Sequence, residues 1–228
     1  MMDASPDKTR VRDAATLLLV RHSDGHPHVL MGQRGAAAAF MPSKFVFPGG
    51  AVDGDDLAMG EAPLNPSCAV RLAASAALGL GPALALAAIR ETFEETGLAL
   101  GAPATNDGIG AAPDGWRAFL DQGLRPSSEK LRFMFRAVTP PGRPRRFDAR
   151  FFMADAGQVV GDPDDFSGAS GELSHLRWIP LNRARELEMP FITEIVLAEL
   201  AEILASPEAD RPVPFFRHDA ERSEFVAL

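Results

Sequence analysis

The stretch RETFEETGLAL, residues 90–100, places an arginine and three glutamates within six positions, directly after a run rich in alanine and leucine. An α-helix turns about 100° per residue, so the carboxylates of Glu91, Glu94 and Glu95 share one face of a helix through this stretch. The opposite face carries three apolar side chains that can pack against a sheet: Leu86, Ile89 and Phe93. The stretch therefore predicts a packed helix with an acidic side.

The acidic side is costly for a helix unless a cation binds to it. Like charges three or four residues apart cost about 0.2–0.5 kcal/mol per pair. Glu94 and Glu95 also precede the helix-ending Gly97, and the last turn of a helix disfavours each anion by about 0.3–1 kcal/mol. Ala87 and Ala88 on the same side leave room for another chain or a ligand. Oxygen ligands without nearby His or Cys favour Mg²⁺ or Mn²⁺ over zinc, and the alternative is a solvated acidic face.

These residues resemble the second half of the Nudix box, whose pattern is G-x5-E-x7-R-E-U-x-E-E-x-G-U with U aliphatic. Six positions match at the right spacing: Arg90, Glu91, Glu94, Glu95, Gly97 and Leu98. Thr92 departs from the pattern. In FPGGAVDGDD, Gly50 supplies the motif glycine, and Asp56 stands where the family has its first glutamate. Between Asp56 and Arg90 there are 33 residues instead of seven, so the box carries an insertion of 26 residues.

The interrupted box is similar to that of the Nudix branch typified by nucleoside diphosphate-linked moiety X motif 19, a coenzyme A diphosphatase. Two other segments, AFMPSKFVFPGG at 39–50 and RRFDARFF at 145–152, resemble the same branch. The resemblance covers about residues 12–205. It implies a divalent-metal-dependent diphosphatase (pyrophosphohydrolase) that uses Mg²⁺ or Mn²⁺, with the α/β/α sandwich of the α+β class.

The resemblance also implies roles for the matching residues. The expected metal ligands are the carbonyl of Gly50 and four carboxylates: Glu91, Glu94, Glu95 and Glu172. The expected catalytic residues are Arg90, Glu91 and Glu94. Glu91 would bind a second ion, or it would orient or deprotonate the attacking water, while Arg90 would fix the carboxylates by charge-assisted hydrogen bonds. Which acid replaces the first box glutamate stays open among four candidates: Asp56, Asp53, Asp55 and Glu61.

The sequence before the box bears on the substrate. Coenzyme-A-cleaving Nudix proteins often carry L-L-T-x-R-[SA]-x3-R-x3-G-x3-F-P-G-G, in which Leu30 and Arg34 match, while Ala39 and Ser43 do not. Arg34 and the dense basic patch at 143–146 are therefore expected to bind substrate phosphates. The residues that we assign to substrate binding are Arg34, Arg145 and Arg146. The alternatives are a surface arginine at a strand end for Arg34 and a solvated loop for the patch.

The implied reaction cleaves the diphosphate of coenzyme A or an acyl-CoA into 3′,5′-ADP and a phosphopantetheine product. One alternative is another nucleoside diphosphate derivative, such as ADP-ribose, NADH or a dinucleoside polyphosphate. Another is a Nudix-fold binding module without catalysis. Substitution of Glu94 by Gln separates enzyme from module, because it should abolish turnover and leave ligand binding by a module little changed.

Composition limits the partners. The net charge of -8 and the pI near 5.1 argue against binding to nucleic acid or to an anionic membrane. The single Cys68 cannot form an intramolecular disulfide, the N-terminal residues lack a signal-peptide core, and the ending FVAL is not a peroxisomal address. We therefore expect a cytoplasmic protein. The uncharged run at 72–89 is broken by two glycines and a proline, which favours two helices over a membrane span.

Residues 1–228 are expected to form one domain, with an insertion at about 57–81 and a C-terminal tail at about 206–228. Strands are predicted at 14–20, 28–34 and 45–52 and within LRFMFRAV, RRFDARFFMAD and HLRWIPL. Helices are predicted from Pro66 to near Gly79, from Pro82 to Gly97, around GWRAFLDQGL and over 191–205, with loops at 53–65, 101–114 and 161–172. The pattern predicts a mixed sheet flanked by helices. Two adjacent phenylalanines in the tail need cover, which leaves a homodimer open.

Overall fold

The computed structural model describes residues 10–38, 40–60, 62–104, 112–207, 210–218 and 222–228. Within them, one mixed sheet runs in the order β10-β2-β1-β8-β7-β11-β12, with β3 added to β2 and β4 added to β1. Its strands are β1 Val11–Ser23, β2 His26–Arg34, β3 Phe45–Val46, β4 Gly49–Ala51, β7 Arg132–Val138, β8 Arg146–Asp155, β10 Leu173–Pro180, β11 Pro214–His218 and β12 Ser223–Ala227. A smaller sheet joins β6 Leu124–Pro126, β5 Ala99–Pro103 and β9 Val159–Val160.

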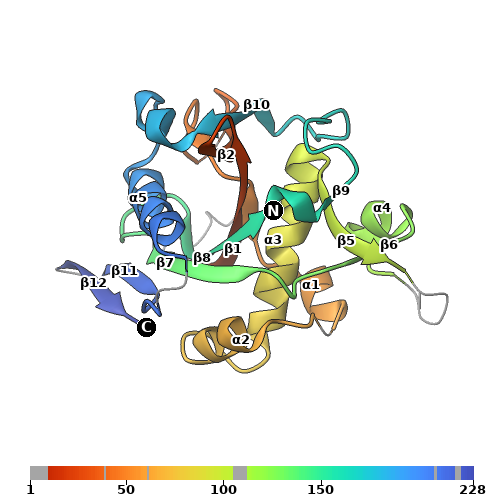
Figure 1. The fold of residues 1–228 in the computed structure, drawn as a ribbon. Helices are drawn as coiled ribbons and strands as arrows, with labels where there is room; N and C mark the ends of the chain where they lie inside the picture. The colour runs from red at the N-terminus through yellow and green to blue at the C-terminus, as the bar shows by residue number, and fades with distance from the viewer. Residues whose placement is uncertain (1–9, 39, 61, 105–111, 208–209, 219–221) are drawn as a thin grey trace, which may run out of the picture.

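Two helices cover opposite faces of the large sheet (Figure 1). Helix α3, Leu80–Thr96, packs on the face that receives Leu17 and Leu19 of β1, and helix α5, Phe191–Ala205, packs on the face that receives Leu18 and Val20. Successive strand side chains point to opposite faces, so the unbroken run LLLV supplies both cores. The predicted α/β/α arrangement is confirmed. The part of the chain that the structure describes contains no helix long and apolar enough to cross a membrane.

The helix ends follow local signals. Helix α2, Pro66–Ala73, begins at the predicted Pro66 and ends before the predicted Gly79. Asn65 caps it by accepting a hydrogen bond from the amide of Cys68. Helix α3 begins at Leu80, two residues before the predicted Pro82, and Gly97 ends it in the left-handed conformation, with φ of 80°. The predicted helix over 191–205 is confirmed, and its Leu197, Leu200 and Ile203 are buried in the core.

The predicted loop between the two halves of the box contains a helix that sequence analysis missed. Helix α1, Gly54–Ala58, is closed by a capping box in which Asp53 accepts from the amide of Asp55 and Asp56 accepts from the amide of Asp53. In the predicted loop at 101–114, β5 continues to Pro103 and η1, Asp114–Trp116, begins at Asp114, while 105–111 lie outside the described residues. Helix α4, Arg117–Leu120, follows η1 and forms the predicted short helix.

The C-terminal segment is part of the large sheet. Strands β11 and β12 form a hairpin, and β11 pairs in parallel with β7. Phe216 is 8% exposed, and Arg136 of β7 stacks over the ring of Phe215 at 4.2 Å. Both phenylalanines are thus covered within one chain, so they give no reason for dimerisation, and the homodimer stays a prediction.

Candidate active site

Helix α3 brings its acidic face against strand β4. Gly49 of β4 donates its amide hydrogen to Oε2 of Glu95 at 2.8 Å. A methyl group on Gly50 would lie 2.3 Å from Cδ of Glu91, so only glycine allows this approach. Ala87 and Ala88 are fully buried, and the room that they leave is taken by the chain itself and not by a ligand.

Gly50 therefore provides a direct test of the carboxylate geometry. Gly50→Ala should displace Glu91 and lower kcat about 100-fold, since small misplacements of catalytic groups cost that much, while the free energy of unfolding should change little, because the added methyl group meets only the carboxyl end of the Glu91 side chain. Gly54→Ala is the matched control, because no atom lies within 4 Å of its added methyl group. Steady-state kinetics and urea denaturation measure both effects. Wild-type kcat in Gly50→Ala would show that the position of Glu91 does not limit the rate.

Arg90 connects the two halves of the interrupted box. Its Nε donates to Oδ1 of Asp56 at 2.8 Å, and its Nη2 donates to Oδ2 of Asp56 at 3.0 Å and to the carbonyl of Ala51 at 3.1 Å. Its Nη1 lies 3.0 Å from Glu91 and 3.3 Å from Glu94. Among the described candidates Asp53, Asp55 and Asp56, the one that contacts Arg90 is Asp56, while Glu61 lies outside the described residues. Arg90 contacts the carboxylates of α3 as expected.

Asp56 is held by four hydrogen bonds at zero exposure. Besides the two from Arg90, it accepts from the amide of Asp53 at 2.9 Å and from Nε1 of Trp116 at 3.2 Å. Trp116 is itself fully buried and packs edge-on against Phe119. Sequence analysis missed Trp116, which lies 60 residues after Asp56. A buried tryptophan needs an acceptor for its N–H group, and this requirement was the one signal in the sequence that pointed to a polar partner for Trp116.

Burial makes the acidic face electrostatically strained. Burial, together with the charges of neighbouring glutamates, raises the pKa of Glu91 to about 7 against the effect of Arg90, and it raises that of Glu95 to about 8. The Gly49 amide and Arg34 act in the opposite direction on Glu95. A divalent cation would remove this repulsion, because it favours the ionised form of every carboxylate that it contacts.

The loop between β9 and β10 closes over the end of α3. Ser170 donates its amide hydrogen to the carbonyl of Glu94 at 2.9 Å, and Glu172 accepts from Nη2 of Arg34 at 2.9 Å. Nη1 of Arg34 lies 4.0 Å from Glu95. Arg34 therefore connects Glu172 to the acidic face, and its buried Nε has no hydrogen-bond partner among the described residues.

The donor chemistry fits Mg²⁺ or Mn²⁺, while the side chains do not form a closed cage. No group of three or more His, Cys, Asp or Glu that could hold a metal ion occurs among the described residues. Mg²⁺ usually binds one or two carboxylates and completes its shell with waters and substrate phosphates. Glu91 and Glu95 against β4 meet that requirement. The five-ligand set of Gly50, Glu91, Glu94, Glu95 and Glu172 stays a prediction.

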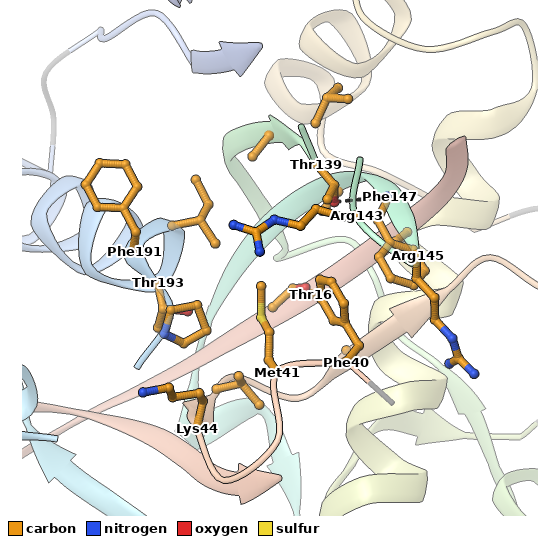
Figure 2. Close-up of a pocket in the computed structure, with 18 of the residues that line it drawn as sticks. Thr16, Phe40, Met41, Lys44, Thr139, Arg143, Arg145, Phe147, Phe191 and Thr193 are labelled. Atoms are coloured by element: carbon orange, nitrogen blue, oxygen red, sulfur yellow. Dashed lines mark hydrogen bonds between the residues drawn. The ribbon is translucent and has the colours of Figure 1, made fainter. Parts of the chain in front are cut away.

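A cavity of about 1040 Å³ begins beside this cluster (Figure 2). Gly49, Gly50 and Arg34 form its border with the acidic face. Its floor and far wall are strand residues: Ala14 and Thr16 of β1, Ala149 and Phe151 of β8, Ala137 of β7, and Phe216 and His218 of β11. The loops after β2 and β7, the start of β8 and the start of α5 complete the wall with Phe40, Met41, Arg143, Arg145, Phe147 and Phe191.

The predicted phosphate-binding arginines lie at different places. Arg34 and Arg145 line the cavity. Arg146 is not among the lining residues, and its Nε donates to the carbonyl of Thr139 at 3.1 Å. Arg143 also lines the cavity, and in Figure 2 its guanidinium group extends toward α5 while that of Arg145 points away past Phe40. The sequence predicted that this loop carries phosphate-binding arginines. The structure shows that Arg143 and Arg145 line the cavity and that Arg146 does not.

Comparisons with known proteins agree with the site. The crystal structure of a NUDIX hydrolase from Alicyclobacillus acidocaldarius is similar to this chain with a TM-score of 0.64 and 32% identity, over 88% of this chain and 94% of that one. The Caenorhabditis elegans protein named "Putative nudix hydrolase 7" is 29% identical over 188 residues, 74% of this chain and 51% of its own length. The chain thus spans about half the length of this curated relative. No protein-family model matches.

The chain belongs to the Nudix hydrolase family. This confirms the family and the enzyme class that the interrupted box predicted. The comparisons do not distinguish the coenzyme A branch from other branches.

Proposed function

We propose that the chain hydrolyses the diphosphate of coenzyme A or an acyl-CoA, with Mg²⁺ or Mn²⁺, to give 3′,5′-ADP and a phosphopantetheine product. The observation that carries this proposal is the position of the cavity, which borders Gly49 and Gly50 where they contact Glu95 and Glu91. Its volume of about 1040 Å³ suits a ligand of that size, since small-molecule sites measure about 300–1,000 Å³. The interrupted box and the partial upstream signature support the same substrate.

The chain's own residues have distinct roles in this proposal. Glu94, Glu95 and the Gly50 carbonyl hold the divalent cation, which would supply charge neutralisation on the phosphates and activate water. Glu91 binds a second ion, or it orients or deprotonates the water from its position against β4. Arg90 keeps Glu91 and Glu94 in place through Nη1. We keep Glu172 as a further ligand.

Arg34 is the residue placed to contact the diphosphate. It lines the cavity, it lies 4.0 Å from Glu95, and its Nε needs a hydrogen-bond acceptor. A guanidinium group offers paired donors that match phosphate oxygens. Arg145 at the rim is available for a second phosphate contact. We also place the protein in the cytoplasm, where a reducing environment suits the single buried Cys68.

A second candidate is another nucleoside diphosphate derivative, such as ADP-ribose, NADH or a dinucleoside polyphosphate. The apolar part of the wall favours it as much as it favours coenzyme A, because aromatic rings such as Phe40 and Phe147 can pack against any nucleobase. The two candidates share the acidic face and differ only in what occupies the cavity.

Chromatography of products from a substrate panel separates the two candidates. We expect coenzyme A and acetyl-CoA to yield 3′,5′-ADP with Mg²⁺ or Mn²⁺, and ADP-ribose, NADH and diadenosine polyphosphates to stay largely intact. The physical reason is that the cavity borders both the acidic face and a cationic rim. Preferential cleavage of ADP-ribose or a dinucleotide would replace the coenzyme A proposal, and a full set of uncleaved substrates with both metals would contradict catalysis.

A further inference from the structure

The charge of the cavity is opposite to that of the chain. The chain has 31 acidic and 23 basic residues. Among the described residues that line the cavity there is no aspartate or glutamate, and four cations are present: Arg34, Lys44, Arg143 and Arg145. A concave surface with one sign of charge and apolar walls attracts ligands of the opposite sign. The lining therefore suits a ligand with several negative charges.

Two of these cations, Arg34 and Arg143, lie in separate regions of the cavity. Arg34 lies beside the acidic face, as its contact with Glu172 and its distance to Glu95 show. Arg143 lies in the loop between β7 and β8. Strand β4 pairs with one edge of β1, and β8 pairs with the other edge. The start of β8 is thus two strand spacings from β4, roughly 10 Å. A single diphosphate bound at Gly50 does not account for both regions.

The loop that carries Arg143 is built to be stiff. Its base is closed by two hydrogen bonds, from the amide of Thr139 to the carbonyl of Phe147 at 2.8 Å and from the amide of Phe147 to Oγ1 of Thr139 at 3.0 Å. Three prolines restrict its backbone: Pro140, Pro141 and Pro144. Gly142, with φ of 81°, makes the turn that directs Arg143 over the cavity (Figure 2). Little entropy is lost when a ligand binds such a loop.

We propose that Arg143 binds a phosphate monoester of the substrate that is separate from the diphosphate being cleaved. The substrate class is then a nucleoside diphosphate derivative with an additional phosphate on its ribose. Coenzyme A, whose 3′-phosphate meets this description, is the member that the proposed function names, and to that extent the inference rests on it. Arg143 acts as a specificity-determining residue, since its planar guanidinium group forms paired hydrogen bonds with a phosphate.

The test compares coenzyme A with dephospho-CoA, which lacks only the 3′-phosphate. The wild-type enzyme should prefer coenzyme A in kcat/KM, and Arg143→Met should lower kcat/KM for coenzyme A about 10- to 100-fold, mainly through KM. Turnover of dephospho-CoA should stay at the wild-type level. Arg143→Lys should recover part of the preference, because it keeps the charge and loses the paired geometry.

Arg125→Met is the matched control, because Arg125 is an exposed arginine on β6 that does not line the cavity. It should keep the wild-type preference. Equal losses on both substrates in Arg143→Met would overturn the inference, since a general defect in binding or folding affects both alike. A wild-type enzyme that cleaves both substrates equally would overturn it as well.

Failure of the proposed function gives a different result. In that case neither coenzyme A nor dephospho-CoA is cleaved, and the same variants are compared on ADP-ribose and ADP-ribose 2′-phosphate. A preference for the phosphorylated member that disappears in Arg143→Met would support the inference without coenzyme A. No preference, or equal losses, would overturn it on this pair too.

Discussion

Glu95→Gln is expected to lower kcat about 1,000-fold while leaving the metal-free protein at least as stable as the wild type. The side chain of Glu95 is 2% exposed, and Gly49 fixes its Oε2 at the border of the cavity. A catalytic cation contributes several kcal/mol of charge stabilisation, and each 1.36 kcal/mol is a factor of ten in rate. A neutral amide keeps the shape of the side chain and the acceptor for Gly49, and it loses the charge that holds the cation.

Stability should change in the opposite direction to activity. Burial raises the pKa of Glu95 from 4.5 to about 8, so the folded state prefers the protonated form. The wild-type protein then loses stability as pH rises from 4.5 through 8 in the absence of metal. Glu95→Gln lacks this loss and should be the more stable protein at pH 8. A purely structural glutamate would show lower stability instead.

The measurements are steady-state kinetics at saturating Mn²⁺ and urea denaturation of the metal-free proteins at pH 5 and pH 8. Glu199→Gln is the matched control, since Glu199 of α5 is a poorly exposed glutamate that pairs with Arg211, away from the acidic face. It should keep wild-type kcat. Activity in Glu95→Gln within tenfold of the wild type would remove Glu95 from the metal site.

The acidic face could be predicted because all of its residues lie close together in the sequence, on one helix. Arg90, Glu91, Glu94 and Glu95 lie within two turns of one helix, so their shared side follows from the helical repeat alone. The end of α3 at Gly97 was equally readable, because a glycine after a helical run adopts the left-handed cap. The spacing of residues along one helix was therefore enough to predict both the metal site and the family.

The partner of Arg90 could not be chosen from the sequence. Asp53, Asp55 and Asp56 are all close to the position of the first box glutamate, and only the path of the loop decides among them. In the structure the capping box of α1 uses Asp53 as the cap, and the same helix turns Asp56 inward to Arg90. Trp116 joins them through a contact across 60 residues, for which no local pattern exists.

The C-terminal hairpin was readable and was missed. PFFRH and SEFVA are short apolar segments separated by a few polar residues, which is a strand signal on each side of a turn. No helical or strand period continues from α5 into these segments, so the sequence analysis predicts a C-terminal tail for both. The orientations of Arg143 and Arg145, in contrast, could not be predicted from the sequence. They depend on the direction of side chains in a loop, and residue spacing does not determine that direction.

Asp56→Ala is expected to destabilise the protein by about 3–5 kcal/mol, because it removes the carboxylate that Nε and Nη2 of the buried Arg90 contact. Arg90 is 7% exposed in its side chain, and Asp56 is fully buried. Trp116 also loses its acceptor. Activity should fall as well, since the guanidinium group that contacts Glu91 and Glu94 through Nη1 is then free to turn.

The contrast with an exposed pair identifies burial as the cause. Asp164 binds Arg21 at 2.7 Å with its own side chain 57% exposed, and Asp164→Ala should cost about 0–1 kcal/mol. Urea denaturation of both variants gives the two free energies of unfolding. Equal costs for Asp56→Ala and Asp164→Ala would mean that water reaches Arg90 and that the two halves of the box are joined by packing alone.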